Sequence, residues 1–365
     1  MENNLPLRSF EIEGYRAIRH LRLPQLERVN LFVGFNNAGK TSLLEGLRLY
    51  ANSISLTSLS EIIRERSGLR LSTPAIVDDI APVVAEATMA FDAVTSLFHG
   101  TYSGSTGSIR LGPTDAASHQ LELTLPWTLN RSGDGDFVPS DEIVAEPSTP
   151  LVQLRQGVQK KDYSLGMFLR GAILRHPQAR SRAEFIPAQG LRIETLAALW
   201  ERTAESGHAS LVEDAVRVIV PDLERCYLLG RGKARRILMQ MRGVARPVPI
   251  TNMGDGTNRV FGIALALVAA QGGVLLIDEV ENGLHHAVQA DVWSAIFTLA
   301  ERLRVQVFAT THSWDAVVGF QAAANQSSAR GLLYRLEREA DGEIYAERYT
   351  EEEVAVAADQ QVEVR

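Results

Sequence analysis

A glycine-rich segment that ends in a lysine and two hydroxyl residues is the clearest candidate for chemistry in this chain. Its residues match the spacing G-x-x-x-x-G-K-[ST] of a phosphate-binding loop, and they are Gly34-Phe35-Asn36-Asn37-Ala38-Gly39-Lys40-Thr41-Ser42. Glycines at both ends let the backbone curl, so that successive N–H groups point at one anion. Lys40 would then reach the β- and γ-phosphates of a nucleotide, and the Thr41 hydroxyl would take one position on Mg²⁺.

Such a loop needs a strand before it and a helix after it, and the sequence offers both. The apolar run 29–33 predicts a buried strand, and residues 43–49 have the leucine spacing of a helix. The alternative is a chance glycine turn before a helix, which leaves the preceding strand without a role. We therefore predict that this segment binds a nucleotide phosphate.

A second apolar run, 273–277, is followed directly by Asp278 and Glu279. A buried strand whose carboxyl end faces a ligand has this pattern. Asp278 is placed to hold Mg²⁺, directly or through water, and Glu279 could orient or deprotonate an attacking water. A strand that simply ends in surface acids is the alternative.

A third apolar run, 305–310, leads to His312. A lone histidine at a strand end is usually structural or exposed, but this strand follows the one that ends in carboxylates. We predict that His312 senses the γ-phosphate. The pair His285 and His286 suggests a metal site less well, because adjacent side chains diverge on a helix and no third ligand stands at metal spacing.

The remaining pattern alternates helices and strands. A glycine turn, 252–259, directly opens an apolar helix at 260–270. We also predict strands and helices at several further places: strands at 7–16, 21–23, 104–112, 121–125, 183–187, 223–251 (two or three strands), 332–336 and 343–349, and helices within 55–98 and at 191–204, 208–219, 287–303 and 314–324. Residues 130–150 are acidic and rich in Gly, Ser and Pro, which indicates a mobile loop. Tyr15 and Arg16 lie either near the nucleotide or in a surface turn.

The 223–251 region also concentrates arginine and lysine. Its basic residues are Arg231, Lys233, Arg235, Arg236, Arg242 and Arg246. A solvated hairpin and a contact with a phosphate backbone both fit this cluster, and the sequence leaves the two open.

Composition limits the protein class. The chain has 365 residues, 45% of them hydrophobic, which suits one body with an inserted lobe. Its net charge of −7 gives no global basic surface for nucleic acid. The single cysteine, Cys226, forms no intramolecular disulfide and is predicted to be a core residue. With no secretory signal and an apolar run, 261–270, too short to span a bilayer, we predict a cytoplasmic protein without a membrane partner.

Together these motifs resemble, in order and context, the ABC-type ATPase heads of the SMC, RecF and OLD (overcoming lysogenization defect) group. The resemblance is close over residues 7–19, 29–49 and 250–315 and loose over 55–240. The motifs correspond as follows: Lys40 and Thr41 look like the Walker A pair, Asp278 and Glu279 like Walker B, His312 like the switch histidine, residues 253–257 like the signature, and Gln189 like the Q-loop glutamine, a further Mg²⁺ ligand.

The resemblance implies an α/β P-loop NTPase with a mixed central sheet, an antiparallel N-terminal layer and an inserted helical and β lobe. It implies three parts: residues 1–54 with Walker A, 55–183 as the inserted lobe, and 184–365 with the other motifs. It also implies ATP and Mg²⁺ as ligands and a homodimer in which Gly254, Asp255 and Gly256 of one head meet the γ-phosphate held by the other.

Two departures limit the expected turnover. Gly254 stands where the signature usually has a serine, and the usual D-loop aspartate is replaced within Gly283-Leu284-His285. The chain has neither the long heptad repeats of chromosome-organising members nor a recognisable Toprim nuclease domain, so we expect a standalone OLD-like ATPase. It would license a separate effector, such as a Toprim-like nuclease, in nucleic-acid metabolism or phage defence. The alternative is a nucleotide-gated scaffold with little turnover.

Overall fold

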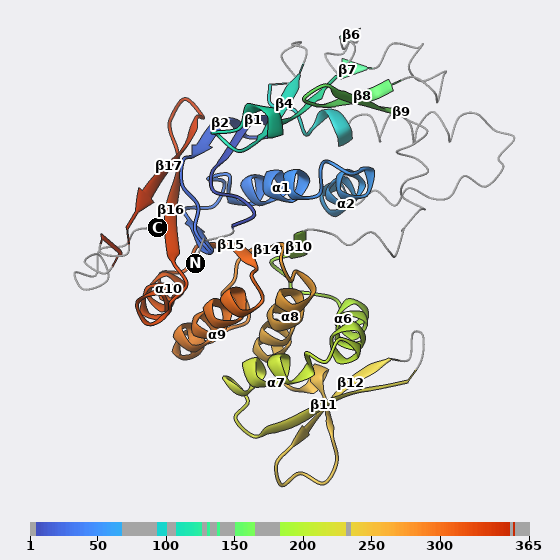
Figure 1. Cartoon of the computed structure of the whole chain (residues 1–365), viewed down its shortest axis with the longest axis vertical. Helices are drawn as coiled ribbons and strands as arrows, with labels where there is room; N and C mark the ends of the chain where they lie inside the picture. Colours follow the sequence, from blue (N-terminus) through green and yellow to red (C-terminus); the bar gives the residue numbers. More distant parts are fainter. Residues whose placement is uncertain are drawn as a thin grey trace, which may run out of the picture.

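The computed structural model arranges the chain in stacked layers (Figure 1). It describes residues 5–67, 93–100, 107–125, 130–131, 137–138, 150–164, 183–230, 235–350 and 353–354. In these ranges an antiparallel sheet lies over helix α1 (Lys40–Ala51), α1 lies over a mostly parallel sheet, and further helices cover that sheet's other face. No helix of the described ranges is both long enough and apolar enough to cross a membrane.

The mostly parallel sheet carries the ends of the predicted functional strands. Its strand order is β10-β14-β15-β3-β16-β17, in which only β17 runs antiparallel to its neighbour. The bounds are β3 (Val29–Val33), β10 (Ala183–Ile186), β14 (Val274–Ile277), β15 (Gln306–Thr311), β16 (Gly331–Arg338) and β17 (Ile344–Tyr349). Because β3, β14 and β15 are parallel neighbours, the three predicted motifs that follow them end at one edge. The predicted mixed central sheet is confirmed.

The antiparallel sheet is larger than the sequence indicated. Its order is β2-β1-β4-β5-β8-β9, with β1 (Phe10–Tyr15), β2 (Ile18–Leu23), β4 (Ser108–Gly112), β5 (Leu121–Thr124), β8 (Pro150–Gln156) and β9 (Gln159–Ser164). The hairpin β8–β9 was not predicted, because polar and charged residues fill most of β9. Strands of the predicted inserted segment therefore extend the sheet begun by the N-terminal strands.

Helix α1 (Lys40–Ala51) lies between the two sheets, and α2 (Leu56–Ser67) continues beside it (Figure 1). Successive side chains of β14 point to opposite faces of the parallel sheet, and both faces are covered. Val274 and Leu276 point toward the core that contains α1, while Leu275 and Ile277 point toward the helices of the other face. All four side chains are buried, which is why β14 is a continuous apolar run.

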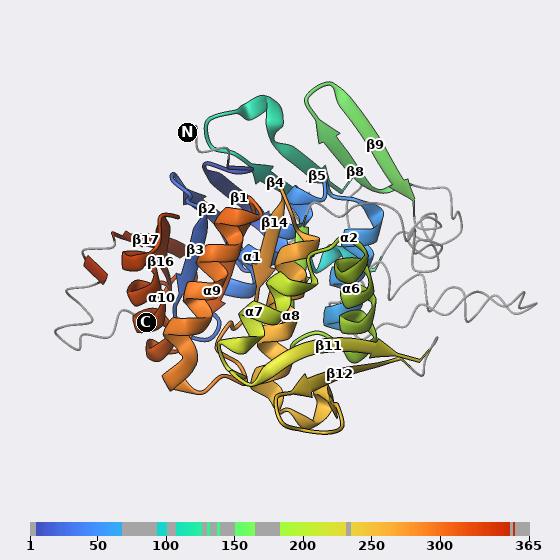
Figure 2. The same cartoon turned by 60° about the horizontal axis from the view of Figure 1, so that its bottom comes forward.

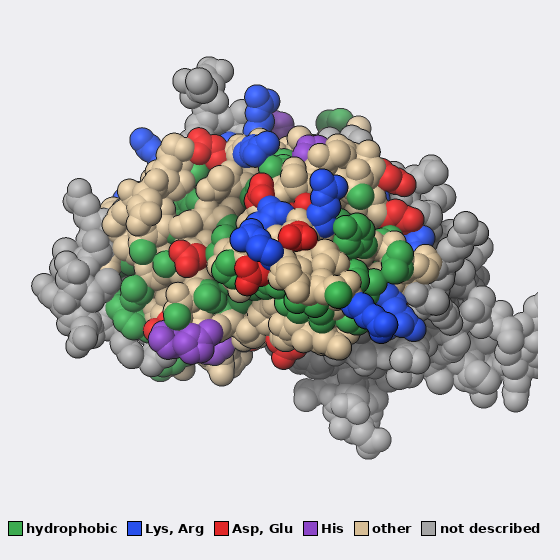
Figure 3. All heavy atoms as spheres, turned by 90° about the horizontal axis from the view of Figure 1, so that it is seen from below, with side chains coloured by type: hydrophobic (Ala, Val, Ile, Leu, Met, Phe, Trp, Pro, Cys, Tyr) green, Lys and Arg blue, Asp and Glu red, His purple; other side chains and the backbone are tan. Residues whose placement is uncertain are grey.

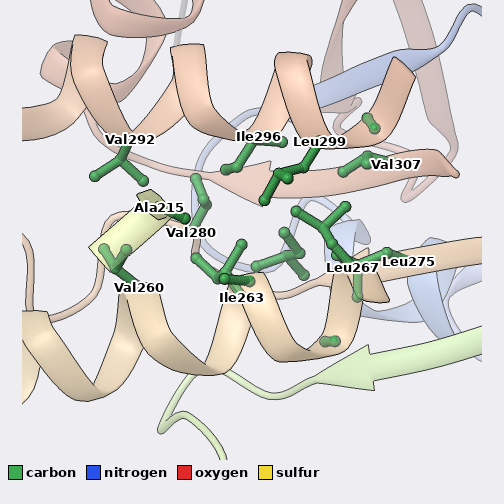
Figure 4. Packing of buried hydrophobic residues seen from close by; sticks show 14 of the residues in the cluster. Ala215, Val260, Ile263, Leu267, Leu275, Val280, Val292, Ile296, Leu299 and Val307 are labelled. Carbon is green, nitrogen blue, oxygen red and sulfur yellow. The ribbon is translucent and has the colours of Figure 1, made fainter. Parts of the chain in front are cut away.

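A layer of helices covers the other face of the parallel sheet, as Figure 2 shows. They are α6 (Ile193–Glu205), α7 (Ala209–Arg217), α8 (Asp255–Ala269), α9 (Gln289–Arg302) and α10 (Trp314–Gln326). Side chains at helical spacing on α8 and α9 meet over β14 and β15 (Figure 4). Short 3-10 helices stand at Ala117–His119, Ile250–Asn252 and His286–Val288.

A separate three-stranded sheet packs beside α7 and is formed by β11 (Leu223–Leu229), β12 (Arg236–Met241) and β13 (Val248–Pro249). This confirms the strands predicted for 223–251. Cys226 is buried in β11, as predicted, and burial raises the pKa of its thiol to about 12. Two very short strands, β6 (Asn130–Arg131) and β7 (Phe137–Val138), pair within the segment predicted as a mobile loop, most of which lies outside the described residues.

One local prediction needs correction, and one open question is answered. Helix α8 begins at Asp255 rather than at residue 260, so most of the predicted glycine turn belongs to the helix. The sequence left open whether Tyr15 and Arg16 lie near the nucleotide or in a surface turn. In the structure Tyr15 is fully buried, and both side chains bond to Glu45 of α1. They support the helix that carries the phosphate loop.

Candidate active site

The predicted phosphate loop connects β3 to α1. Gly34 and Gly39 have φ of +146° and +89°, a backbone that other residues rarely adopt. A Cβ on Gly34 would lie 2.4 Å from the carbonyl oxygen of Leu336, so a side chain does not fit there. The glycines of the motif are thus required by the loop's own curvature and by its close approach to β16.

Lys40 folds back over this loop. Its ammonium group donates to the carbonyl oxygens of Gly34 at 2.5 Å and Phe35 at 2.9 Å. Burial lowers the pKa of Lys40, although the nearby carboxylates of Glu279 and Asp278 oppose that shift. A cation at the mouth of the loop, close to two carboxylates, is what binding of a phosphate with a metal ion requires.

Thr41 and Asp278 come together from opposite ends of the sequence. The Thr41 hydroxyl lies 3.4 Å from one Asp278 oxygen, and the Thr310 hydroxyl donates to the other at 2.7 Å. Burial raises the pKa of Asp278, while these hydroxyl contacts work against the shift. Two of the three predicted Mg²⁺ ligands are therefore neighbours. Gln189, the third, lies exposed in the turn after β10.

Glu279 has an unusual backbone, with φ of +47°. Its N–H donates to the Thr310 hydroxyl at 2.9 Å, and its carboxylate accepts from the Asn282 amide at 2.6 Å. The other carboxylate oxygen lies 3.8 Å from His312 Nδ1. The side chain is one-third exposed, so a water molecule can reach the carboxylate.

His312 has a second carboxylate partner that the sequence reasoning missed. Glu281 accepts the backbone N–H of His312 at 3.0 Å, and the same oxygen lies 3.2 Å from the ring Nδ1. Glu281 is buried, and its other oxygen has no hydrogen-bond partner among the described residues. The only sequence signal was a third acidic residue shortly after Asp278.

The predicted signature opens α8. Gly254 precedes the helix with φ of +85° and ψ of 166°, a conformation that glycine alone adopts readily. Gly256 packs so closely on Gly283 that a Cβ would lie 2.9 Å from the Gly283 carbonyl oxygen. The signature is thus joined to the turn that follows the carboxylates, and its first-turn N–H groups lie at the positive end of α8.

Acidic side chains lie among the basic residues around β11 and β12. Arg235 pairs with Glu201, and Arg217 pairs with Asp214. Figure 3 views the molecule from the side of these strands, where Lys and Arg side chains stand among Asp and Glu side chains. Arg231 and Lys233 lie outside the described residues. Arg236, Arg242 and Arg246 are exposed, and both interpretations of this cluster, a solvated hairpin and a contact with a phosphate backbone, stay predictions.

The chain resembles known proteins in both sequence and fold. Residues 123–319, more than half of the chain, match the family described as "AAA domain, putative AbiEii toxin, Type IV TA system". The chain belongs to this AAA-domain family. The matched residues of this AAA-domain protein include Asp278, Glu279, His312 and the signature.

Relatives of this AAA-domain protein align with different shares of its sequence. An "ATP/GTP phosphatase" of Helicobacter pylori is 18% identical over 330 residues, which cover 85% of this chain and 86% of that protein. The RecF "DNA replication and repair protein" of Thermomicrobium roseum is 39% identical over 70 residues, 19% of this chain and 18% of that protein.

Among solved structures, the SMC head bound to the C-terminal winged-helix domain of ScpA aligns with a TM-score of 0.52 and 10% identity. It covers 94% of this chain and 97% of the SMC chain. The predicted fold, an α/β P-loop ABC-type ATPase head, is confirmed, and the AAA-domain family and the phosphatase relative confirm the predicted enzyme class, an ATP hydrolase.

Proposed function

We propose that this chain binds ATP at residues 34–42, hydrolyses it, and uses ATP-dependent dimerisation to license a separate effector. The observation that carries the proposal is the convergence of Lys40, Thr41, Asp278, Glu279 and His312 on one edge of the parallel sheet. Each side chain has the chemistry that attack of water on a γ-phosphate needs.

In this reaction the loop N–H groups and Lys40 bind the phosphates and stabilise the charge that develops on them. Glu279 accepts a proton from the attacking water as the new oxygen–phosphorus bond forms and the bond to the β-phosphate oxygen breaks. His312, held by Glu281, orients the γ-phosphate from the neighbouring strand end. Asn282 holds the Glu279 carboxylate in place.

The donors present suit Mg²⁺. A hydroxyl and a carboxylate oxygen, from Thr41 and Asp278, lie 3.4 Å apart beside the loop, and oxygen ligands are those that Mg²⁺ prefers. Asp278 is a buried carboxylate that a cation would stabilise. When bound, Mg²⁺ supplies positive charge to the phosphate oxygens. Gln189 is proposed as a third ligand only if its exposed turn moves toward the site.

The position of the signature supports the proposed dimer. The signature, with Gly254, Asp255 and Gly256, presents helix N–H groups at the start of α8, which suit a phosphate held by a second copy. The RecF relative, named as a DNA replication and repair protein, supports a role in nucleic-acid metabolism. We extend this to an OLD-like ATPase of phage defence that acts with a separate effector, and we propose a Toprim-like nuclease and nucleic acid as its partners.

The division into parts and the location belong to the same proposal. We propose that residues 1–54 and 184–365 form the ATPase head and that 55–183 form an inserted lobe. The single cysteine supports a reducing compartment, and we propose the cytoplasm.

The test is the Glu279→Gln variant. It should lower phosphate release by roughly 100-fold or more, because general-base catalysis contributes at least that much. Light scattering should then show the molar mass doubling only with Mg-ATP, since blocked hydrolysis traps the closed state. Glu224→Gln, an exposed carboxylate on β11, is the matched control and should behave as the wild type.

The second candidate function is a nucleotide-gated scaffold with little turnover. Gly254 favours it, because this signature offers no hydroxyl to the γ-phosphate. Wild-type phosphate release at background, together with ATP-dependent doubling of mass, would select the scaffold. Turnover that Glu279→Gln abolishes would select the enzyme.

A further inference from the structure

Arg259, in the second turn of α8, is a buried cation that bonds only to backbone. Its side chain is 4% exposed. One guanidinium nitrogen donates to the carbonyl oxygens of Pro187 at 2.8 Å and Ala188 at 3.5 Å. The other donates to those of Asp278 at 2.6 Å and Glu279 at 2.7 Å. No ion pair to Arg259 is found within the described ranges.

A buried charge without a paired carboxylate is unfavourable for folding. Burial lowers the pKa of Arg259 to about 10, although the carboxylates of Glu281, Asp278 and Glu279 lie near enough to oppose the shift. Its Nε also lacks a hydrogen-bond partner in the described structure. An apolar side chain would avoid the buried charge but would remove the donor from four carbonyl oxygens, so the guanidinium is explained by these contacts rather than by packing.

The four acceptors belong to two separate turns. Residues 187–188 follow β10, and residues 278–279 follow β14. A guanidinium is planar and has several donors in a fixed fork, so it can hold both turns at once. A lysine ammonium would present its donors from a single point and would not span both turns with the same geometry.

One of these turns contains the proposed general base. The left-handed backbone of Glu279, φ +47°, is a strained conformation that surrounding contacts must hold. Thr310 accepts the Glu279 N–H, and Arg259 donates to the Glu279 carbonyl, so the residue is held on both sides. The Ala188 carbonyl also accepts from Asn282, whose amide donates to the Glu279 carboxylate.

We propose that Arg259 is a positioning residue. It fixes the backbone of Glu279 and ties the signature helix to the turn after β10, so that a movement of α8 is passed directly to the carboxylate that activates water. This rests on the proposed function in one respect, the role of Glu279 in hydrolysis. The fixing of the two turns is a property of the fold and can be measured without turnover.

The test compares Arg259→Met and Arg259→Lys with Arg28→Met. Arg28 is a second buried arginine with an unpartnered nitrogen, just before β3 at the opposite end of the parallel sheet, so its loss controls for general destabilisation. Phosphate release against ATP concentration gives kcat and KM. Thermal unfolding gives the folded fraction, and hydrogen–deuterium exchange reports on the amides of residues 188–190 and 278–282.

We expect Arg259→Met to lower kcat by roughly 100-fold, the scale for a small misplacement of a reacting group. KM for ATP should change less than about threefold because the phosphate loop is untouched. Arg259→Lys should recover part of kcat. Exchange should rise in both turns for Arg259→Met and stay unchanged there for Arg28→Met, even if both variants lose similar stability.

The inference is overturned if exchange in the two turns is unchanged in Arg259→Met, or if its kcat per folded molecule stays within about threefold of the wild type. A wild type without turnover would instead reject the proposed enzyme. In that case the exchange measurement still decides whether Arg259 holds the turns.

Discussion

The hydroxyl of Thr41 lies 3.4 Å from a carboxylate oxygen of Asp278, although 237 positions separate them in the sequence. If the two residues share a Mg²⁺, binding of the ion depends on the hydroxyl of Thr41 and not on the volume of its side chain. Thr41→Val should raise the Mg²⁺ concentration for half-maximal turnover by roughly 10- to 100-fold, the scale for losing a partner in a metal site. Thr41→Ser keeps the hydroxyl and should stay close to the wild type. Equal effects of the two substitutions would argue against Thr41 as a ligand.

The convergence of these residues could be predicted because each lies directly after a strongly apolar strand. The runs before Gly34, Asp278 and His312 are short, continuous and buried, which is the pattern of central parallel strands. Parallel neighbours end at one edge, so local sequence was enough to bring the motifs together.

Other parts of the site depend on tertiary contacts and could not be predicted. Arg259 looks like an ordinary polar residue at the start of an apolar helix, and only the fold shows that it is buried among carbonyl groups. Glu281 looks like a surface acid until His312 arrives from the next strand. The hairpin β8–β9 was missed because most of its second strand is polar, so no hydrophobic alternation marks it.

Glu281 should act on turnover through His312. Removing its carboxylate leaves the His312 N–H without the acceptor at 3.0 Å and the ring without its partner at 3.2 Å. Glu281→Ala and His312→Ala should each lower kcat. The double variant should lose no more than the larger single loss, because residues that act through one contact are not additive.

The control for this double-mutant cycle combines Glu281→Ala with Glu224→Ala. Their effects on kcat should add, because Glu224 lies on the exposed part of β11. Full additivity between Glu281→Ala and His312→Ala would show that the two residues act separately. Glu281→Gln keeps an oxygen acceptor and should retain more activity than Glu281→Ala.

Lys40 gives the site a pH dependence. Burial lowers its pKa below the ordinary lysine value, so in the nucleotide-free protein the ammonium loses its proton at a lower pH than an exposed lysine would. The charge that binds phosphate is present below that pKa and is lost above it. Affinity for Mg-ATP should therefore weaken as pH rises through the alkaline range.

Titration calorimetry between neutral and alkaline pH measures this effect. Lys40→Arg is the control because a guanidinium stays charged throughout the range. Its affinity should be lower at neutral pH, since the fork does not fit the two loop carbonyls as the ammonium does, but it should not decline further with pH. An equal alkaline decline in both proteins would assign the effect to another group.

Gly254 is required by its backbone, which argues against restoring the usual signature serine. With φ of +85° and ψ of 166°, any side chain is strained there, although no atom lies within 4 Å of a Cβ placed on this glycine. Gly254→Ser and Gly254→Ala should therefore each cost about 1–3 kcal/mol of folding free energy. Urea denaturation measures that loss.

Gly272 offers a matched control, because its φ is +74° and it also has open space around a placed Cβ. Gly272→Ala should lose similar stability and keep ATP-dependent dimerisation. Both Gly254 variants should impair dimerisation in the Glu279→Gln background, because a shifted backbone turns the first N–H groups of α8 away from the partner's phosphate. If Gly254→Ser instead strengthens the dimer and raises turnover, the backbone yields to the new hydroxyl, and the glycine itself is what limits the rate of this head.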